Sequence, residues 1–418
     1  MINPEGSLRS FRHRNFRILY PANAASNIGT WTQRVAQDWL VLQLTHSGRD
    51  LGLVTGLQFL PALLFSLYGG RLADRFNKRI LLYITNLGGG ISALLLGLLV
   101  ITHNVAIWHV YLLAFALGVF TAIDAPIRQA FTSEMVGKSD LANAVSLNSA
   151  NFNAGRLIGP GLSGLLIAWF GTGPSFLINA TSYLFVMIAL YFIDEEKLHI
   201  ESAPQESAKI REAWQYVKAR PDIFAVMVTV FFAATFGLNF QIFTALMATS
   251  EFHRGAASYG SLGSVVAIGS LSGALISAKL DQKRSPRFII LFAVLFGASV
   301  ALTAIAPTYF TYALTLPISG ALGLTTMIAA NSYVQVRTDP AIRGRVMGIY
   351  LTIFMGGTPV GSPLIGWLAT QVGTRQMIAI CGAITSLAVA IIYALKRGKL
   401  KPPASILVAD VLAARGKN

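Results

Sequence analysis

The stretch Tyr68-Gly-Gly-Arg-Leu-Ala-Asp-Arg-Phe-Asn-Lys-Arg-Ile-Leu-Leu82 decides the fold, because it places five ionised groups between two long apolar runs. It is too short to be a domain. Dense charge at the end of an apolar run is typical of a tight cytoplasmic turn between two membrane helices. We therefore predict that the runs on either side of residues 68 to 82 cross a membrane.

The rest of the chain also has the composition of a membrane protein. Of its 418 residues, 54% are hydrophobic and 12% are charged, and the mean hydropathy is +0.58. Such a chain is too apolar for a water-soluble protein. Runs of about 20 apolar residues, each long enough to cross a bilayer as a helix, recur from end to end. We predict twelve spans, at residues 17–43, 49–71, 79–102, 107–133, 142–169, 174–193, 222–249, 256–279, 286–306, 309–335, 344–371 and 375–396.

Lysine and arginine are distributed unevenly among the connections between these spans. They gather in the N-terminal arm, in residues 71–79, 279–287 and 337–345, and after residue 396. Because short cytoplasmic loops carry the excess of positive charge, both termini are expected in the cytoplasm. The net charge of +15 is then explained by this asymmetry and by anionic lipid. No nucleic-acid partner is expected, since the basic residues form no single groove.

The longest polar stretch, residues 194–221, divides the chain near its middle. We predict an N-terminal six-helix bundle (1–193), a cytoplasmic linker with a short amphipathic helix (194–221), a C-terminal six-helix bundle (222–396) and a cytoplasmic tail (397–418). The linker helix is suggested by Ile210, Trp214 and Val217, which recur at helical spacing among charged residues. An exposed linker helix with no further role fits that spacing equally well.

The two halves repeat each other at a separation of 202 residues. At this offset Gly155 corresponds to Gly357, and Gly164 corresponds to Gly366. Two parallel repeats of six helices are the arrangement expected of a secondary transporter, with the substrate path between the halves near the middle of the membrane.

The charged stretch also resembles the signature loop of the major facilitator superfamily, Gly-x-Leu-Ala-Asp-Arg-x-Gly-Arg-Arg-x-x-Leu, starting at Gly70. Asn77 stands where the family has glycine, and asparagine tolerates the left-handed turn expected there. The resemblance implies an all-α membrane protein of twelve transmembrane helices in two pseudo-symmetric six-helix bundles, working as a monomer by alternating access. It also implies a role in cytoplasmic gating, which it gives to four residues: Gly70, Asp74, Arg75 and Arg79. Alternatively, these charges only fix the topology.

The first span carries a polar stripe along an otherwise apolar helix. At 100° per residue its members fall on one face: Asn23, Asn27, Thr30, Arg34, Gln37 and Asp38. Such a face should line a hydrated cavity or pack on another helix, because ionisable groups at membrane depth are costly. We assign Asn23, Asn27, Thr30 and Gln37 to a substrate cavity. Arg34 and Asp38 lie one turn apart and can pair, although both could instead reach the outer headgroups.

Asp124 and Arg128 lie one turn apart in the fourth span, with Pro126 between them. A buried carboxylate beside an arginine can change between a paired ionised state and a protonated state when the arginine moves, as proton coupling requires. We therefore assign proton coupling to Asp38 and Asp124, with Arg34, Arg128 and Arg156 as electrostatic partners. A permanent structural ion pair is the alternative for Asp124 and Arg128.

The fifth span contains a run of glycines with one proline. Glycines four residues apart let a neighbouring helix approach closely, and a proline bends its own helix. We assign helix packing to Gly155, Gly159, Pro160 and Gly164, and we add Asn151, on the same span, to the substrate cavity. The run is similar to the motif Gly-x-x-x-Gly-Pro-x-x-Gly-Gly of the exporter branches of the superfamily, with Ser163 as a departure, and this similarity implies antiport.

The C-terminal half has no acidic residue deep in a span, so it should offer uncharged substrate contacts. Phe236, Asn239 and Phe240 are the candidates, although aromatic side chains in membrane helices also serve packing. No metal site or cofactor is expected, because the chain has a single cysteine and no metal-spaced histidine pair.

Other stretches, such as residues 124–130 and 156–160, look like the branch that contains the bacterial enterobactin exporter and macrolide or multidrug efflux proteins. The resemblance implies a proton-coupled antiporter, not an enzyme, that lies in membrane lipid and exports small amphiphilic molecules of the drug or siderophore class. An importer or symporter of a nutrient, or a lipid flippase of the same fold, would share the charges described above.

Overall fold

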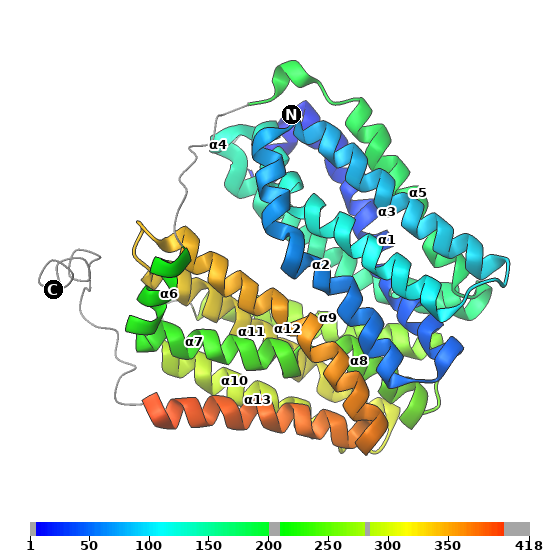
Figure 1. The fold of residues 1–418 in the computed structure, drawn as a ribbon, viewed down its shortest axis with the longest axis vertical. Helices are drawn as coiled ribbons and strands as arrows, with labels where there is room; N and C mark the ends of the chain where they lie inside the picture. The colour runs from blue at the N-terminus through cyan, green and yellow to red at the C-terminus, as the bar shows by residue number, and fades with distance from the viewer. Residues whose placement is uncertain (1–5, 200–209, 281–284, 397–418) are drawn as a thin grey trace, which may run out of the picture. The chain divides into compact units, whose positions relative to one another are not determined.

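The computed structural model describes residues 6–199, 210–280 and 285–396, and these residues form helices and short connections without β-strands. Figure 1 shows the helices in chain order. The thirteen α-helices of the described residues are α1 (Arg14–Thr45), α2 (Gly48–Arg75), α3 (Lys78–Ile101), α4 (Ile107–Phe170), α5 (Gly173–Tyr191), α6 (Ile210–Ala219), α7 (Pro221–Phe232), α8 (Phe240–Leu246), α9 (Ala256–Lys279), α10 (Pro286–Thr303), α11 (Tyr309–Arg337), α12 (Arg343–Val372) and α13 (Thr374–Lys396). Four shorter turns are η1 (Arg9–Arg12), η2 (Glu195–Lys197), η3 (Ala233–Gly237) and η4 (Met247–Glu251).

Each of the twelve predicted spans lies on helical structure. The span at 222–249 is divided into α7, η3, α8 and η4. Within the described residues, nine helices are long and apolar enough to cross a membrane, or ten if the bent α2 is counted. Helix α1 is not among them, as expected of a helix with a polar residue on almost every turn, and α4 is counted once although it holds two predicted spans. The predicted tail, 397–418, lies outside the described residues.

The two predicted spans within α4 are separated at Gly137. This residue has φ 67° and interrupts the helical backbone, in a region that L side chains rarely adopt. At the C-terminal end of α4, Gly171 ends the helix with φ 76°, and Gly373 follows α12 with φ 87°. Gly171 and Gly373 are 202 residues apart, so the internal repeat extends to the backbone conformation at these helix ends.

Asn77 does not form the left-handed turn expected from the sequence. Its φ is −60°, and its side chain accepts hydrogen bonds from the backbone N–H groups of Arg79 and Ile80. Asparagine is a preferred N-terminal capping residue because its side-chain oxygen satisfies N–H groups that have no partner in the helix. Asn77 therefore starts α3 by capping it rather than by adopting a conformation that needs glycine.

Contacts between residues divide the chain into two compact units. The first unit comprises residues 1–204, 240–267 and 362–374. Within it, α1 packs on α4 and α5, α2 packs on α4, and α3 packs on α4 and α5. A core cluster of this unit includes Phe16, Leu82 and Phe131, each almost completely buried. This packing places α1 against α4 and α5, where its polar residues meet other helices.

The second unit comprises residues 205–239, 268–361 and 375–418. Its linker helix α6 buries Ala213 and Val217, while Trp214 is 40% exposed. At the start of α7, Arg220 donates to the two carboxylate oxygens of Asp222, over 2.9 and 2.8 Å. The hydroxyl of Tyr333 in α11 donates to the same carboxylate over 2.9 Å. These contacts attach the start of α7 to α11.

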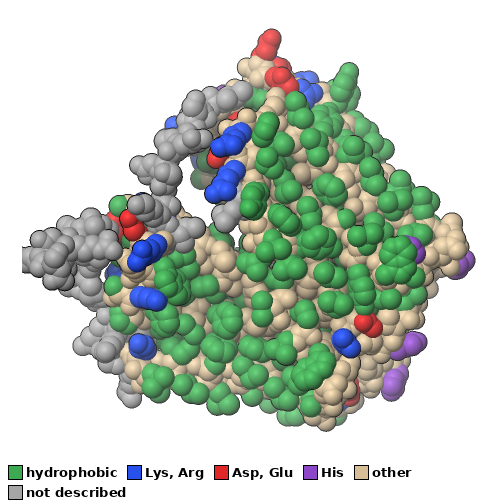
Figure 2. All heavy atoms as spheres, viewed as in Figure 1, with side chains coloured by type: hydrophobic (Ala, Val, Ile, Leu, Met, Phe, Trp, Pro, Cys, Tyr) green, Lys and Arg blue, Asp and Glu red, His purple; other side chains and the backbone are tan. Residues whose placement is uncertain are grey.

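Large apolar side chains remain exposed on many helices. They include Leu87 and Leu94 of α3, Leu184 of α5 and Leu387 of α13. Figure 2 shows hydrophobic side chains spread over the viewed face of the molecule. Exposed apolar surface on this scale marks a membrane or protein contact rather than a surface in water, and it agrees with helices that face lipid.

Candidate functional site

A cavity of about 560 Å³ opens within the first unit, among α1, α3, α4 and α5. Three of its lining residues are charged: Arg34, Asp124 and Arg128. Four are aromatic: Trp31, Phe120, Phe152 and Tyr183. The others used below are Asn23, Asn27, Thr30, Thr85, Thr132, Asn148 and Asn151. Seven residues assigned from the sequence thus line one cavity, namely Asn23, Asn27, Thr30, Arg34, Asp124, Arg128 and Asn151.

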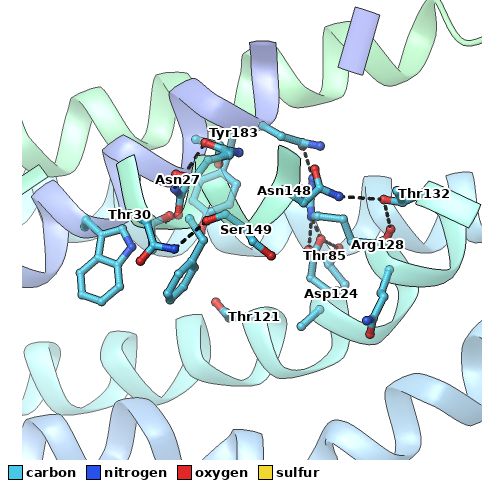
Figure 3. Close-up of a pocket in the computed structure, with 18 of the residues that line it drawn as sticks. Asn27, Thr30, Thr85, Thr121, Asp124, Arg128, Thr132, Asn148, Ser149 and Tyr183 are labelled. Carbon is cyan, nitrogen blue, oxygen red and sulfur yellow. Dashed lines mark hydrogen bonds and ion pairs between the residues drawn. The ribbon is translucent and has the colours of Figure 1, made fainter. Parts of the chain in front are cut away.

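Asp124 and Arg128 form a salt bridge on the wall of this cavity (Figure 3). Arg128 donates from Nε to Oδ1 of Asp124 over 2.6 Å and from Nη2 to Oδ2 over 2.9 Å. The Oδ2 atom also accepts from the hydroxyl of Thr85 over 2.8 Å and from the amide of Asn86 over 3.1 Å. These charge-assisted hydrogen bonds fix the carboxylate between α3 and α4. The sequence predicted the pair but not the two donors from α3.

Arg128 also reaches the polar stripe of α1. Its Nη1 donates to Oδ1 of Asn23, and its Nη2 donates to Oδ1 of Asn86 over 3.3 Å. Deeper along the stripe, Asn27 donates to the backbone carbonyl of Asn151 over 2.6 Å. The hydroxyl of Thr30 lies 3.5 Å from Oδ1 of Asn179 in α5. The stripe therefore faces the cavity and neighbouring helices rather than lipid.

Arg34 lies in this cavity and has, among the described residues, no anionic partner at hydrogen-bond distance. Its guanidinium carbon lies 4.8 Å from the ring centroid of Trp31 and 4.9 Å from that of Phe59. Its Nε atom is buried and has no hydrogen-bond partner within residues 6–199, 210–280 and 285–396. Among the described residues, no ion pair joins Arg34 to Asp38, although the two are one turn apart. Gln37, whose two amide atoms are also buried without partners, does not line the cavity.

Asp38 instead contacts two residues that come much later in the chain. Its Oδ2 accepts from the amide of Gln241 and, over 2.8 Å, from the hydroxyl of Tyr259. Only 1% of Asp38 is exposed, and Tyr259 stacks on Trp39 with ring centroids 6.4 Å apart. All of these residues belong to the first unit. The sequence marked Asp38 but gave no signal for either partner.

The glycines of the fifth span are packed against other helices. A Cβ added to Gly159 would lie 2.5 Å from Cβ of Trp31, and one added to Gly164 would lie 2.9 Å from the carbonyl oxygen of Ala256. Pro160 is buried, and a Cβ added to Gly263 would lie 2.8 Å from Cβ of Pro160. The close approach expected from the glycine spacing is therefore present on two sides of α4.

The other candidates for substrate binding do not line this cavity. Asn239 is 4% exposed and Phe240 is 8% exposed, and Phe236 stacks on Phe232 with ring centroids 6.2 Å apart. Arg156 is half-buried and, among the residues that the structure describes, has no ion pair or hydrogen bond.

The residues assigned to gating fall into two groups. Gly70 and Asp74 line a second, smaller pocket of about 380 Å³ beside Pro126, and both Asp74 and Arg75 are exposed. Arg79 has a different environment. It donates to the backbone carbonyls of Leu190 and Tyr191 over 2.8 Å each, and to the carboxylate of Glu195 over 2.7 Å. Arg79 thus ties the start of α3 to the end of α5.

One polar cluster was not foreseen from the sequence. Asp140, beside the Gly137 break, is 2% exposed and is surrounded by the N-terminal arm: Arg9 at 3.3 Å, Arg12 at 2.8 Å and His13 at 2.7 Å. Burial alone would raise the pKa of Asp140, but the hydrogen bond from His13 and the charge of Arg12 hold this pKa below its ordinary value. The cluster attaches the arm to α4.

No group of three or more metal-ligating side chains occurs within the described parts of the chain. The arrangement of the cavity instead suits the binding of a small molecule, with amide and hydroxyl groups, one internal ion pair and a further cation among aromatic rings.

The sequence profile of the family described as transmembrane secretion effectors matches residues 5–406. Among curated proteins, the chain is 23% identical to the staphyloferrin A transporter of Staphylococcus aureus, over 90% of this chain and 94% of that one. It is 22% identical to the enterobactin exporter EntS of Shigella flexneri, over 94% and 95%.

Among solved structures, a bacterial homolog of the human lysosomal transporter Spinster superposes with a TM-score of 0.74 at 16% identity, over 94% of this chain and 99% of that one. A D-xylose-proton symporter superposes with a TM-score of 0.70 at 14% identity, over 90% and 97%. At these identities the structural likeness establishes the fold alone, and the fold expected from the signature loop is confirmed.

Proposed function

The chain belongs to the transmembrane secretion effector family of the major facilitator superfamily, and from this premise we propose that it is a proton-coupled antiporter that exports amphiphilic small molecules. As a member of this family it is a multi-pass secondary transporter that lies in lipid and moves small molecules, and it is not an enzyme. The direction, the coupling ion and the substrate class are the content of the proposal.

The observation that carries the proposal is the ion pair of Asp124 and Arg128 on the wall of the cavity. In this conformation the carboxylate accepts hydrogen bonds from Arg128, Thr85 and Asn86. A rearrangement that removes Arg128 would leave a carboxylate at membrane depth without its counter-charge, the condition in which such a group takes up a proton. Alternating access supplies a rearrangement of this kind.

Asp38 is the second group proposed to respond to protons. Its contacts with Gln241 and Tyr259 connect α1 to α8 and α9 within the first unit. Protonation would remove the charge that these two donors stabilise, and would weaken the contact. Arg34 and Arg156 are proposed to act on these carboxylates through their charge, since neither forms an ion pair with them among the described residues.

Export of a siderophore or drug-like molecule is supported by the relatives, one of which is named an enterobactin exporter and another a staphyloferrin A transporter. At 22% and 23% identity, these names support a substrate class rather than a particular substrate. The proposed location is the bacterial inner membrane, with both termini in the cytoplasm, where Gly70, Asp74, Arg75 and Arg79 would form part of the inner gate. The proposed working unit is a monomer.

The test uses purified protein in vesicles with an imposed pH gradient, after a compound panel in an efflux-deficient host has supplied a substrate. We expect transport against the substrate gradient to require the proton gradient, and we expect Asp124→Asn and Asp38→Asn each to abolish this gradient-driven accumulation. Substrate accumulation at wild-type rates in both variants would exclude the coupling assignment. Proton movement in the same direction as the substrate would indicate symport, and lipid movement without a gradient would indicate a flippase.

A further inference from the structure

The net charge of the cavity in the first unit resides on one residue. Of its three charged lining residues, Asp124 and Arg128 neutralise each other through two hydrogen bonds. Arg34 is the third, and it contributes a charge of +1 that no lining carboxylate balances. A cation held among aromatic rings attracts an anion strongly, because few water molecules screen it there.

The surroundings of Arg34 remove water from the guanidinium without neutralising it. Trp31 and Phe59 lie at 4.8 and 4.9 Å from its central carbon, and aromatic faces stabilise a cation through their quadrupole while leaving its charge in place. The Nε–H is buried and has no acceptor in the part of the chain that the structure describes. Because an unsatisfied buried donor is unfavourable, the site is incomplete until an acceptor arrives.

Asp38 is the acidic residue of the same helix that could neutralise Arg34, but its side chain contacts other residues. It accepts from Gln241 and Tyr259, it is 1% exposed and it does not line the cavity. Its charge therefore moderates the field at Arg34 but does not occupy the donors of Arg34. Those donors form a planar fork that matches a carboxylate or another pair of adjacent oxygens.

We propose that Arg34 is the anion-binding residue of the substrate cavity, and that the substrate is an organic anion with an aromatic or similarly flat apolar part. This rests on the proposed function, which makes the cavity a substrate site. The anionic group lies against Arg34, and the flat part lies against Trp31, Phe120, Phe152 or Tyr183, which line the same cavity. The amides and hydroxyls of the polar stripe remain available for neutral polar groups of the substrate.

The experiment compares two probes of almost identical shape, 2-naphthoate and its neutral amide 2-naphthamide, on the full-length protein in lipid nanodiscs by isothermal titration calorimetry. Wild-type protein is expected to bind the anion about tenfold more tightly than the amide or better, because a charge-assisted bidentate contact is lost with the amide. Arg34→Gln is expected to remove this preference. Arg34→Lys should keep part of it, since lysine retains the charge but not the fork.

The matched control is Arg17→Gln, which removes the same type of residue from an exposed position of the same helix and should leave the preference unchanged. Equal binding of the two probes by wild-type protein, or no binding of either at millimolar concentration, would overturn the proposal. A preference that survives in folded Arg34→Gln protein would also overturn it. The wild-type comparison does not depend on the folding of any variant.

This outcome can be separated from that of the proposed function. The calorimetry needs no gradient and no direction of transport. Selective binding of 2-naphthoate without proton-driven export would contradict antiport and leave the anion site standing. Proton-driven export of compounds without any preference for anions would support antiport and contradict the anion site at Arg34.

Discussion

Gly164 and Gly260 meet backbone to backbone in the first unit, and a Cβ on Gly260 would lie 2.8 Å from Cα of Gly164. A second contact of the same kind joins Gly366 and Gly52, where a Cβ on Gly366 would lie 2.9 Å from Cα of Gly52. Gly164 and Gly366 correspond at the repeat offset of 202 residues, so each contact contains one of these two equivalent glycines. The repeat seen in the sequence therefore determines two closely packed helix crossings.

We expect Gly164→Ala to weaken the first of these crossings. The new methyl group would press on backbone atoms, which cannot move aside as a flexible side chain can, and overpacking of this kind costs about 1–3 kcal/mol. Transport should slow because the packed arrangement forms less readily, and Gly366→Ala should have a similar effect. The measurements are the transport rate in vesicles and the melting temperature of the purified protein.

Gly348→Ala is the control for both variants. Gly348 lies in α12, and a Cβ there would meet nothing within 4 Å. Because alanine favours helix more than glycine does, this variant should retain activity and be as stable as wild type or more so. Equal behaviour of Gly164→Ala and Gly348→Ala would contradict a packing role for Gly164.

Asp124→Asn alone should destabilise the protein more than Asp124→Asn and Arg128→Gln do together. The single change leaves Arg128 at membrane depth without its counter-charge, and breaking a buried pair on one side costs about 3–5 kcal/mol. Here Arg128 is 26% exposed and Asp124 is 16% exposed, so a value toward the low end is expected. The double variant removes both charges and should recover most of the lost stability, while gradient-driven transport stays absent.

A double-mutant cycle of melting temperatures measures this coupling. Strictly additive effects of the two substitutions would show that the ion pair does not contribute to stability. Recovery of proton-driven transport in the double variant would show that the pair is structural, which is the alternative that the sequence left open.

Tyr259→Phe should weaken the attachment of α1 to α9. The change removes the hydroxyl that donates to Asp38 over 2.8 Å and keeps the ring that stacks on Trp39. A hydrogen bond to a charged group contributes about 1.5–3 kcal/mol, so a lower melting temperature is expected. Tyr191→Phe, at a position that is 72% exposed, should leave the melting temperature unchanged. A similar small change in both variants would mean that Gln241 alone suffices to hold Asp38.

The sequence could predict features that depend on spacing along one helix, and it missed partners that depend on how helices cross. Asp124 and Arg128 were found because four residues make one helical turn. The partners of Asp38, at positions 241 and 259, follow from packing between elements about 200 residues apart, which no periodicity encodes. The same reason explains why Thr85 was missed as a donor to Asp124.

Backbone conformation was also only partly predictable. The offset of 202 residues correctly related Gly164 to Gly366, since a duplicated fold repeats its close contacts. Asn77 was expected in a left-handed turn because a family pattern has glycine there, yet its side chain caps α3. Asparagine can either adopt a left-handed turn or cap a helix, and only the dihedral angles of Asn77 distinguish the two.

The final prediction concerns the N-terminal arm, which the sequence analysis treated only as positive charge. Asp140→Asn removes the carboxylate that pairs with Arg9, Arg12 and His13. Arg9 and Arg12 are 34% and 45% exposed, so water screens these pairs and their loss should cost about 1–2 kcal/mol. Trypsin should then cleave the arm of the folded protein about 5 to 30 times faster than in wild type. Glu196→Gln, which removes a carboxylate from an exposed position outside this cluster, is the control.

The pH dependence of this attachment has a definite sign. Because the pKa of Asp140 is below its ordinary value in the folded protein, its stabilising effect is fully present above the unfolded pKa of about 3.9 and is lost as the pH falls through the lower folded value. The pairs with Arg9 and Arg12 should therefore persist from neutral pH down to about pH 4. Brief pepsin digestion at a pH below the folded pKa of Asp140 should release the arm in wild type, whereas trypsin should already release it at neutral pH in Asp140→Asn. An arm equally resistant to trypsin in both proteins would show that the hydrogen bonds of Ser10 to Asn143 hold it without the ion pairs.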